Sequence, residues 1–363
     1  MSLRPLFGHH PIRARLAAAA ADGRLPASLL FTGTRGVGKQ RLALWLGQLL
    51  LCERALAERL PEPCGGCVHC RYALRGTHPD LHWYFPLKLE KGTNAEPEHV
   101  AAEYGEAIRA RIVAEGVWSA SDGSVGINLP TAKAMVLRAA MRPSLARRAV
   151  FVVGDAERMA VQEASKEAAN AFLKLLEEPP PGTTLLLTSS EPGLLLPTIK
   201  SRVVTVRVPR LPAADMEAFL DDPVVMRTLG QLPREAAGQR AEGAPGVLFD
   251  GGAAEAARSE AQALMTAALR PGTPDGTAER ALMAARQGNR GARGAFADTL
   301  DALVQLLHTR ARQLAMAGEE AAARRTAASV LVVEAAQARA QGNVNPQLLS
   351  AHLMATLHRM LVP

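Results

Sequence analysis

Short apolar runs recur along the first part of the chain, and each has the length of one buried strand. They are ASLLFTG, which ends at Gly33, LHWYF at 81–85, AVFVVGD at 149–155, TTLLLTSS at 183–190 and VVTVRV at 203–208. Leucines with helical spacing follow the first run, and Ala169, Phe172, Leu173 and Leu176 form another helical stripe. Apolar strands that alternate with helices predict an α/β fold with a parallel sheet covered on both faces.

The pattern changes near Leu211, where strand signals become sparse and helical segments take over. We therefore expect three parts: an α/β domain at 1–208, a small helical part at 209–250 and an all-α domain at 251–363. Residues 86–126 are polar and weakly patterned. We interpret them as an insertion in the first domain, whose structure the pattern does not define.

The composition is that of an ordinary globular protein, with 48% hydrophobic and 21% charged residues. A net charge of +7 slightly favours polyanionic partners, but the basic residues are scattered and form no long run. No apolar run approaches the roughly 18 residues needed to cross a bilayer, and the run LAAAAAD near the N-terminus ends in Asp22. These features predict a cytoplasmic protein with no membrane partner.

The segment GTRGVGKQRLA follows the first apolar run and begins a helix. Gly33, Gly36, Gly38 and Lys39 match the phosphate-binding loop G-x-x-x-x-G-K-[ST], in the strand–loop–helix context that this loop requires. Gln40 stands where the pattern has the hydroxyl that ligates Mg²⁺. The sequence therefore predicts a loop that keeps the phosphate cradle but has lost a metal ligand, and it does not establish whether ATP binds.

The cysteine spacing indicates a metal site. The four cysteines of the chain are Cys52, Cys64, Cys67 and Cys70. The last three form C-x-x-C-x-x-C, and in a reducing compartment such spacing indicates metal ligands rather than disulfides. Four thiolates suit a closed, tetrahedral, structural Zn²⁺ site in an insert at about 52–80. An iron–sulfur cluster is the competing interpretation, and His69 and His78 are spare candidates that four sulfur ligands make unnecessary.

The strand at 149–155 carries an acidic motif in which one acid is missing. A P-loop ATPase ends this strand with an Asp that holds Mg²⁺, followed by a Glu that polarises water, whereas this chain reads VFVVGDAERM. One register places Gly154 at the position of the Asp and Asp155 at that of the Glu. Shifting the register by one makes Asp155 the metal ligand and puts Ala156 in place of the Glu. In either register one acid is missing, which is a second and separate loss beside Gln40.

Four motifs in this order resemble the bacterial DNA polymerase III clamp loader over roughly residues 5–210: GRLPASLLFTGTRGVGK, the four-cysteine insert, AANAFLKLLEEPPPGTTLLLTSS and LLPTIKSRVV. The resemblance implies an AAA+ P-loop domain, followed by a helical lid and a helical collar that joins a ring of subunits. The ATPase subunit gamma/tau shares this plan but keeps a Thr or Ser after the loop Lys and an Asp-Glu pair on the acidic strand. With Gln40 and Gly154-Asp155, the chain is more similar to the delta-prime family, the non-hydrolysing members of the ring.

The resemblance also implies partners and a role. The ring contains gamma/tau and delta, and it uses ATP to open the sliding clamp and place it on primed DNA. A delta-prime-like subunit would have no ATPase or polymerase activity of its own, although it belongs to the DNA polymerase III holoenzyme, a DNA-binding nucleotidyltransferase complex.

One residue of the last motif has an implied role in trans. Where the family has Ser-Arg-Cys, the chain has Ser201-Arg202-Val203. The resemblance implies that Arg202 projects into a neighbouring subunit's ATP site as an arginine finger, a residue that can contribute about 10³–10⁵ in rate. A surface salt bridge is the alternative role for this side chain.

Two other functions remain open from the sequence. The first is a divergent gamma/tau-type ATPase, which ATP hydrolysis by the isolated protein would reveal. The second is a zinc-containing module that binds DNA or a partner on an inert AAA+ scaffold, in which case the zinc region should bind DNA alone.

Overall fold

The structure is a computed structural model that describes residues 2–90, 95–118, 125–159, 163–250, 252–271, 273–287, 295–340 and 345–362. The chain divides into two compact units, one that ends at Asp250 and one that begins at Gly251. Each unit has its own hydrophobic core. None of the helices in the described part of the chain combines the length and the apolar character needed to span a bilayer.

The first unit is built on a five-stranded parallel sheet in the order β2-β3-β4-β1-β5. The strands are β1 (Ser28–Thr32), β2 (Leu81–Tyr84), β3 (Ala149–Val153), β4 (Thr183–Ser189) and β5 (Val204–Arg207). Every residue of β1, β3 and β4 is buried, as expected for interior strands that are covered on both faces. The edge strand β5 is mostly exposed. The predicted α/β fold with a parallel sheet is therefore confirmed, and all five strands lie within the predicted runs.

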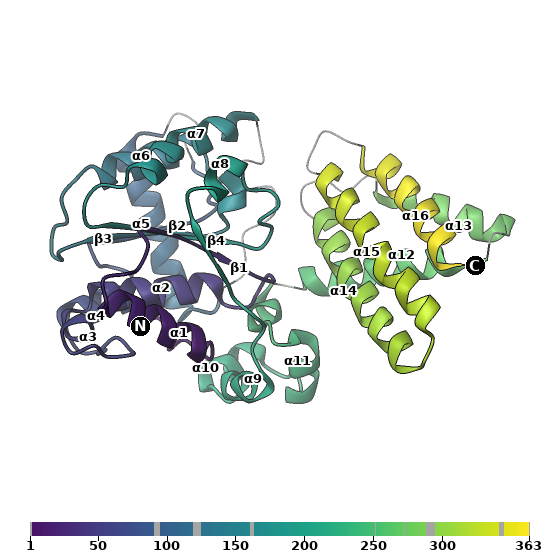
Figure 1. The fold of residues 1–363 in the computed structure, drawn as a ribbon, viewed down its shortest axis with the longest axis horizontal. Helices are drawn as coiled ribbons and strands as arrows, with labels where there is room; N and C mark the ends of the chain where they lie inside the picture. Colours follow the sequence, from purple (N-terminus) through teal and green to yellow (C-terminus); the bar gives the residue numbers. More distant parts are fainter. Residues whose placement is uncertain are drawn as a thin grey trace. The chain divides into compact units, whose positions relative to one another are not determined.

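Helices cover both faces of this sheet, with α2 on one face and α6 and α7 on the other (Figure 1). The helices of this part are α1 (His10–Ala21), α2 (Lys39–Leu51), α3 (Glu53–Ala57), α4 (Val68–Leu74), α5 (Pro97–Val113), α6 (Leu129–Ala139), η2 (Ala156–Met159), α7 (Glu163–Glu177) and α8 (Pro197–Lys200). Phe172 on α7 is fully buried, and Asn128 caps α6 by accepting a hydrogen bond from the Thr131 backbone. Helical spacing thus places the expected apolar stripe in the core.

The insertion at 86–126 contains a helix that the sequence analysis did not predict. Residues 91–94 and 119–124 lie outside the described residues, but α5 occupies most of the remainder. Val100, Tyr104 and Ile112 of α5 are buried, and the Tyr104 hydroxyl donates a 2.5 Å hydrogen bond to the Phe85 carbonyl. The apolar residues at 100, 104, 108 and 112 recur every four positions. This spacing is helical, but the many Ala, Glu and Arg residues between them obscure it.

Residues 209–250 form a small helical cluster that belongs to the first unit. Its helices are α9 (Ala213–Leu220), α10 (Pro223–Leu229), α11 (Arg234–Ala241) and η3 (Pro245–Phe249). They enclose a separate core that includes Met216, Leu220 and Val225. The Leu211 backbone donates to the Gly243 carbonyl at 2.8 Å, which ties the two ends of this cluster together.

The described residues of the second unit form helices with short connections. They are α12 (Ala253–Leu269), α13 (Pro274–Gln287), α14 (Ala295–Met316), α15 (Glu320–Ala340) and α16 (Pro346–Leu361). Leu349, Leu353 and Leu357 of α16 lie in the core of this unit, together with Phe296 and Leu303 of α14. The leucine stripe of the last helix therefore packs within its own unit.

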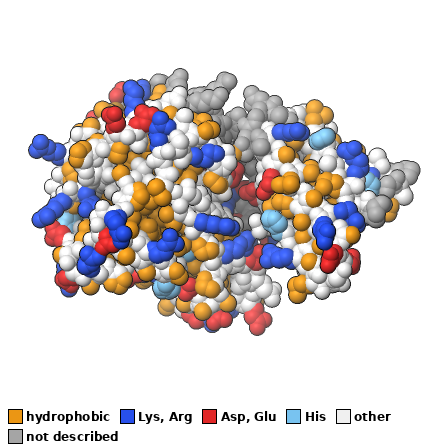
Figure 2. All heavy atoms as spheres, in the orientation of Figure 1, with side chains coloured by type: hydrophobic (Ala, Val, Ile, Leu, Met, Phe, Trp, Pro, Cys, Tyr) orange, Lys and Arg blue, Asp and Glu red, His pale blue; other side chains and the backbone are white. Residues whose placement is uncertain are grey.

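Charge is distributed evenly on the surface that Figure 2 draws, where Lys and Arg side chains lie among acidic and apolar ones. This distribution agrees with the scattered basic residues of the sequence.

A buried carboxylate orders the loop that leads into β3. Asp80, immediately before β2, is fully buried and accepts hydrogen bonds from the backbone of Ser144 (2.6 Å), Leu145 (2.8 Å) and Ala146 (2.7 Å). Burial alone would raise the pKa of Asp80, but these three donors lower it below its usual value. The ionised carboxylate thus stabilises the folded first unit.

We predict that Asp80→Ala lowers the free energy of unfolding of the first unit by at least about 1.5–3 kcal/mol, the usual worth of hydrogen bonds to a charged group. Urea unfolding followed by tryptophan fluorescence measures it, because the three tryptophans all precede residue 250. The stabilisation should be complete above the unfolded pKa near 3.9 and should disappear as the pH falls through the lowered folded pKa. Asp221→Ala, which removes an exposed ion pair with Arg234, is the control and should change stability little. Equal effects of the two changes would contradict this role for Asp80.

Candidate functional site

The glycine loop lies between β1 and α2, as the phosphate-loop pattern requires. Gly36 and Gly38 have φ values of +83° and +92°, which side chains other than glycine rarely adopt. Lys39 begins α2 and turns back over the loop. Its Nζ donates to the carbonyls of Gly33 and Thr34 and to the Ser190 hydroxyl, each at 2.9 Å. All three N–H bonds of the ammonium group thus have protein acceptors.

Lys39 is 5% exposed and carries the charge that a phosphate would need. Burial lowers the pKa of Lys39 to about 8, although Asp155 and Glu157 oppose this shift. A phosphate that used this lysine would compete with its three protein acceptors. In this conformation the protein itself supplies a hydrogen-bond acceptor for each N–H of the Lys39 ammonium group.

The metal side of the loop is filled by Gln40. A Cβ atom on Gly154 would lie 2.5–2.7 Å from the terminal atoms of the Gln40 side chain, so the amide packs directly against this glycine and would have to shift if residue 154 had a side chain. The Gln40 amide Nε2 donates to the Asp155 carboxylate at 3.2 Å, and its Oε1 accepts from Trp83 Nε1 at 3.3 Å. Residue 40 thus contacts both Gly154 and Asp155, the two residues that the alternative registers place at the metal-ligand position.

An aromatic cluster with an arginine completes this side of the site. Arg111 on α5 donates to Gln40 Oε1 at 3.4 Å. Its guanidinium carbon lies 3.3 Å from the Phe85 ring centroid, 4.9 Å from that of Trp83 and 5.0 Å from that of Trp118. A guanidinium over aromatic faces at these distances is attracted by the ring electrons. A cation of the protein itself therefore lies next to Gln40.

The helical cluster at 209–250 closes over the other side of the loop. The Gly246 backbone donates to the Gly36 carbonyl at 2.8 Å, and a Cβ atom on Gly36 would lie 2.9 Å from the Val247 nitrogen. His9 also contacts the loop, with Nε2 at 2.8 Å from the Val37 carbonyl. The backbone of the 244–247 segment and the side chain of His9 therefore hold the loop in place.

Glu157 is a buried acid next to this site. Its Oε1 accepts from the Ser190 backbone at 3.0 Å, and its Oε2 has no hydrogen-bond partner among the described residues. Burial raises the pKa of Glu157 to about 7, and the charge of Asp155 adds to this shift. The acid thus lies close to Lys39 and Ser190 without a partner for its second oxygen.

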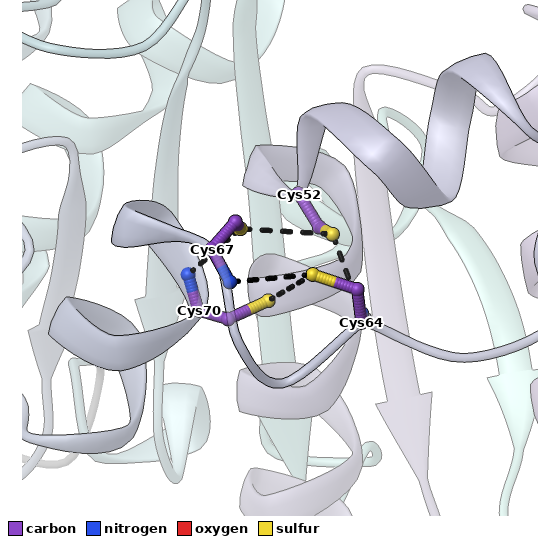
Figure 3. A group of neighbouring side chains, drawn as sticks. All are labelled: Cys52, Cys64, Cys67 and Cys70. Carbon is purple, nitrogen blue, oxygen red and sulfur yellow. Dashed lines mark hydrogen bonds between the residues drawn. The ribbon is translucent and has the colours of Figure 1, made fainter.

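The four cysteines come together at one end of α2, as Figure 3 shows. Their sulfur atoms all lie within 4.8 Å of one another, so the group could hold a metal ion. Four backbone N–H groups, those of Ala55, Cys64, Cys67 and Cys70, each donate to a cysteine sulfur at 3.4 Å. Such N–H donors stabilise thiolates, the form in which cysteine binds metals. The predicted clustering of these residues is confirmed.

His69 and His78 are buried near the cysteines but interact with each other. His69 Nδ1 lies 2.9 Å from His78 Nε2, and His78 Nδ1 accepts from the Asp80 backbone at 3.0 Å. Because Nδ1 of His78 accepts a hydrogen bond and carries no hydrogen, the Nε2 of the neutral ring carries it and donates to His69. These nitrogens are therefore engaged in a hydrogen-bonded chain, apart from the group of four sulfurs.

Arg202 lies just after α8, outside both the glycine loop and the cysteine group. It forms an ion pair with Glu177 Oε1 at 2.6 Å and donates to the Thr198 carbonyl at 2.8 Å. One third of its side chain is exposed, and Glu177 is 46% exposed. The surface salt bridge considered as an alternative for Arg202 is thus present in the isolated chain.

A parallel sheet whose interior strand leads through a glycine loop into a helix defines a P-loop α/β protein. The chain belongs to the DNA polymerase III, delta subunit family, whose family model matches residues 8–212, more than half of its length. The resemblance to a delta-prime clamp-loader subunit is thereby confirmed.

Curated relatives agree with this family. The delta' subunit of Pseudomonas aeruginosa DNA polymerase III is 38% identical over 185 residues, which cover 51% of this chain and 43% of that protein. The Escherichia coli delta' subunit is 30% identical over 191 residues, covering 52% of this chain and 44% of the other. The Escherichia coli tau subunit is 27% identical over 212 residues, covering 58% and 26%. The chain thus spans less than half the length of these curated relatives.

Several residues of the site were not predicted from the sequence. These are His9, Trp83, Arg111, Ser190 and Gly246. Trp83 and Ser190 lie in predicted strand runs, but neither these runs nor any other sequence feature indicated contact with the glycine loop. The aromatic run LHWYF ends at the carboxyl edge of a strand, where residues of a parallel sheet face the loop. That position is the one signal that could have indicated Trp83.

We predict that Gly36→Ala destabilises the first unit more than Gly23→Ala does. Both glycines have positive φ, so both changes carry the left-handed penalty of roughly 1–2 kcal/mol. A Cβ atom on Gly23 would meet nothing within 4 Å, whereas one on Gly36 would push against Val247 and open the contact with Gly246. Thermal melting of the two variants tests this prediction. If they melt together, the contact between the loop and the 244–247 segment contributes nothing.

Proposed function

We propose that the protein is a non-hydrolysing, delta-prime-like subunit of the DNA polymerase III clamp loader. In this role it joins gamma/tau and delta subunits in a ring that uses ATP to load the sliding clamp on primed DNA. The observation that carries the proposal is Gln40, which fills the space at Gly154 and hydrogen-bonds to Asp155. A P-loop ATPase holds Mg²⁺ at this place, so the arrangement favours a subunit without hydrolysis of its own.

The proposed arrangement has an AAA+ P-loop domain at 1–208, a lid at 209–250 and a collar at 251–363. The separate small core around Met216 and Val225 supports a lid distinct from the sheet domain. The helices from α12 to α16, with a core of their own, support an independent collar. In the proposed ring, the collar joins this subunit to its neighbours.

Arg202 is the proposed arginine finger for a neighbouring subunit's ATP site. Its partial exposure and its position after the four-residue helix α8 support this role. The ion pair with Glu177 does not oppose it, because exposed ion pairs contribute only about 0–1 kcal/mol. A guanidinium can therefore exchange an exposed carboxylate for a phosphate, which it binds through two parallel N–H bonds.

The four cysteines are the proposed ligands of one structural Zn²⁺ ion. Four sulfur ligands complete a tetrahedral zinc site and leave no position for water or substrate. Cys52 ends α2 and caps α3, and Cys67 caps α4, so the ion would join three helices. Its contribution would be to stability and not to chemistry.

A divergent gamma/tau-type ATPase is the main alternative, and a zinc module that binds DNA on an inert scaffold is the second. ATP hydrolysis by the purified chain separates the first from our proposal. Binding of DNA by the zinc region alone would favour the second.

We predict that the isolated protein does not hydrolyse ATP, but that Arg202→Ala slows ATP hydrolysis and clamp loading by the assembled ring. The loss should be smaller than the full arginine-finger range of about 10³–10⁵, because other interfaces in a ring would keep their own arginines. Arg202→Lys should restore little, since lysine is a point charge without the planar fork of arginine. Reconstituted complexes, with assembly verified by gel filtration, are assayed for both rates.

Glu177→Gln is the matched control for this experiment, because it removes the same ion pair and keeps Arg202. It should leave ring ATPase activity near that of the wild type. If Arg202→Ala rings retain full activity, the trans role is refuted. Hydrolysis by the isolated wild-type chain would instead support the gamma/tau-type alternative.

We predict one Zn²⁺ per chain and its loss in Cys67→Ser, with a lower melting temperature of the first unit. Metal binding to a preformed site adds to folding free energy, so loss of the ion destabilises the fold. Elemental analysis of the purified protein measures the metal. His69→Gln serves as the control and should retain zinc. Iron with visible absorbance, or free thiols without metal, would contradict the proposal.

A further inference from the structure

The insertion at 86–126 places one positively charged side chain, that of Arg111, in the glycine-loop site. Arg111 is the α5 residue whose guanidinium touches Phe85, Trp83 and Trp118 and donates to Gln40. Arg109, two residues earlier on the same helix, is instead 69% exposed and lies 3.9 Å from Glu106. The helix therefore directs one of its two neighbouring arginines into the site and leaves the other in solvent.

The environment of Arg111 is unfavourable for a charge unless that charge has a specific partner. Burial lowers the pKa of Arg111 to about 10, while the negative charge of Asp155 raises it. The aromatic rings supply further attraction, which is strongest where water is excluded. Arg111 therefore provides positive charge beside the same carboxylate to which Gln40 donates.

The Gln40 side chain contacts residue 154 and hydrogen-bonds to Asp155, Trp83 and Arg111. The terminal atoms of Gln40 occupy the volume that any side chain at residue 154 would need. Its amide joins Asp155 on one side and both Trp83 and Arg111 on the other. A side chain at residue 154 would therefore push the Gln40 amide from the position in which it contacts these three partners, and a change at residue 111 removes one of them.

We propose that Arg111 is an internal cation that takes the place of the divalent metal, so that α5 locks Gln40, Gly154 and Asp155 in a closed, metal-free arrangement. This inference goes beyond the absence of hydrolysis, because it concerns binding: Mg²⁺–nucleotide is excluded by side chains of the chain itself. It also gives the insertion a role, namely to stabilise a glycine loop that has no ligand.

A purely structural role for Arg111 would be to pack α5 against the sheet. In that case its removal would affect stability, but it would not depend on residues 40 and 154. Coupling among the three positions is therefore the property that separates the two explanations.

The first experiment is a double-mutant cycle on the full chain, with melting followed by tryptophan fluorescence. Trp83 and Trp118 lie against Arg111, so their emission reports on the site itself. Gly154→Ala should lower the melting midpoint, because its Cβ would displace Gln40. Gln40→Ala removes that obstacle, so the double variant should melt no lower than Gln40→Ala alone. Residues in direct contact show such non-additivity, whereas independent sites do not.

The second experiment examines Arg111 itself. Arg111→Met keeps apolar volume over the rings but removes the charge, and it should lower the midpoint by roughly 4–8 °C and change tryptophan emission. Arg109→Met is the matched control from the same helix and should shift the midpoint by about 2 °C or less. In Arg111→Met the effect of Gln40→Ala should be smaller than in the wild type, because one of the partners of Gln40 is already lost.

The third experiment adds ATP with Mg²⁺, each at millimolar concentration, to the wild-type protein. A ligand that binds the folded state raises the melting temperature, so we expect no shift relative to the protein with ATP alone or Mg²⁺ alone. A clear, Mg²⁺-dependent increase would overturn the proposal, as would additive effects of Gly154→Ala and Gln40→Ala. Neither result would bear on Arg202, whose role is measured in the assembled ring.

Discussion

Because all five strands of the sheet run in the same direction, their carboxyl ends meet at one edge, and the whole candidate site depends on this constraint. The glycine loop follows β1, Trp83 lies on β2, Gly154 and Asp155 follow β3, and Ser190 follows β4. Segments that are more than a hundred residues apart in sequence thus come within hydrogen-bonding distance. An antiparallel pairing of any one of these strands would send its terminal residues to the opposite edge.

At this edge the protein has replaced ligand contacts by contacts of its own. The lysine that would bind phosphate donates to two loop carbonyls and to Ser190, and the residue that would bind metal is a glutamine held by Asp155, Trp83 and Arg111. In the sequence, Gln40 and Gly154 are two separate departures from the P-loop ATPase pattern. In the structure the two residues are neighbours, since the glutamine amide lies where a Cβ atom on residue 154 would meet it. A loop that is satisfied in this way needs no nucleotide to hold its shape.

The sequence predicted the features that depend on local pattern. Buried runs predicted the strands, the glycine spacing predicted the loop, and the C-x-x-C-x-x-C spacing predicted that the sulfurs would meet. It did not predict α5, whose buried positions are separated by Ala, Glu and Arg. Nor could it predict that Arg111 rather than Arg109 enters the site, because two residues on a helix differ by about 200° in direction and only packing against Phe85 and Trp83 selects one. Similarly, Glu177 and Arg202 are distant in sequence, and their ion pair follows from the fold.

Helix α2 connects the two sites that the sequence indicated separately. It begins with Lys39 and Gln40 in the glycine loop and ends at Cys52, a member of the cysteine group. Almost all of its residues are buried, so it cannot shift along its axis without disturbing the core. Its N-terminal end is held by the contacts of Lys39 and Gln40, and its C-terminal end is held by the backbone donors to Cys52. A metal ion at the cysteines would therefore fix the C-terminal end of α2. The N-terminal end of the same helix is held by protein contacts alone. With both ends held, the buried helix would tie the cysteine group and the glycine loop into one rigid part of the first unit.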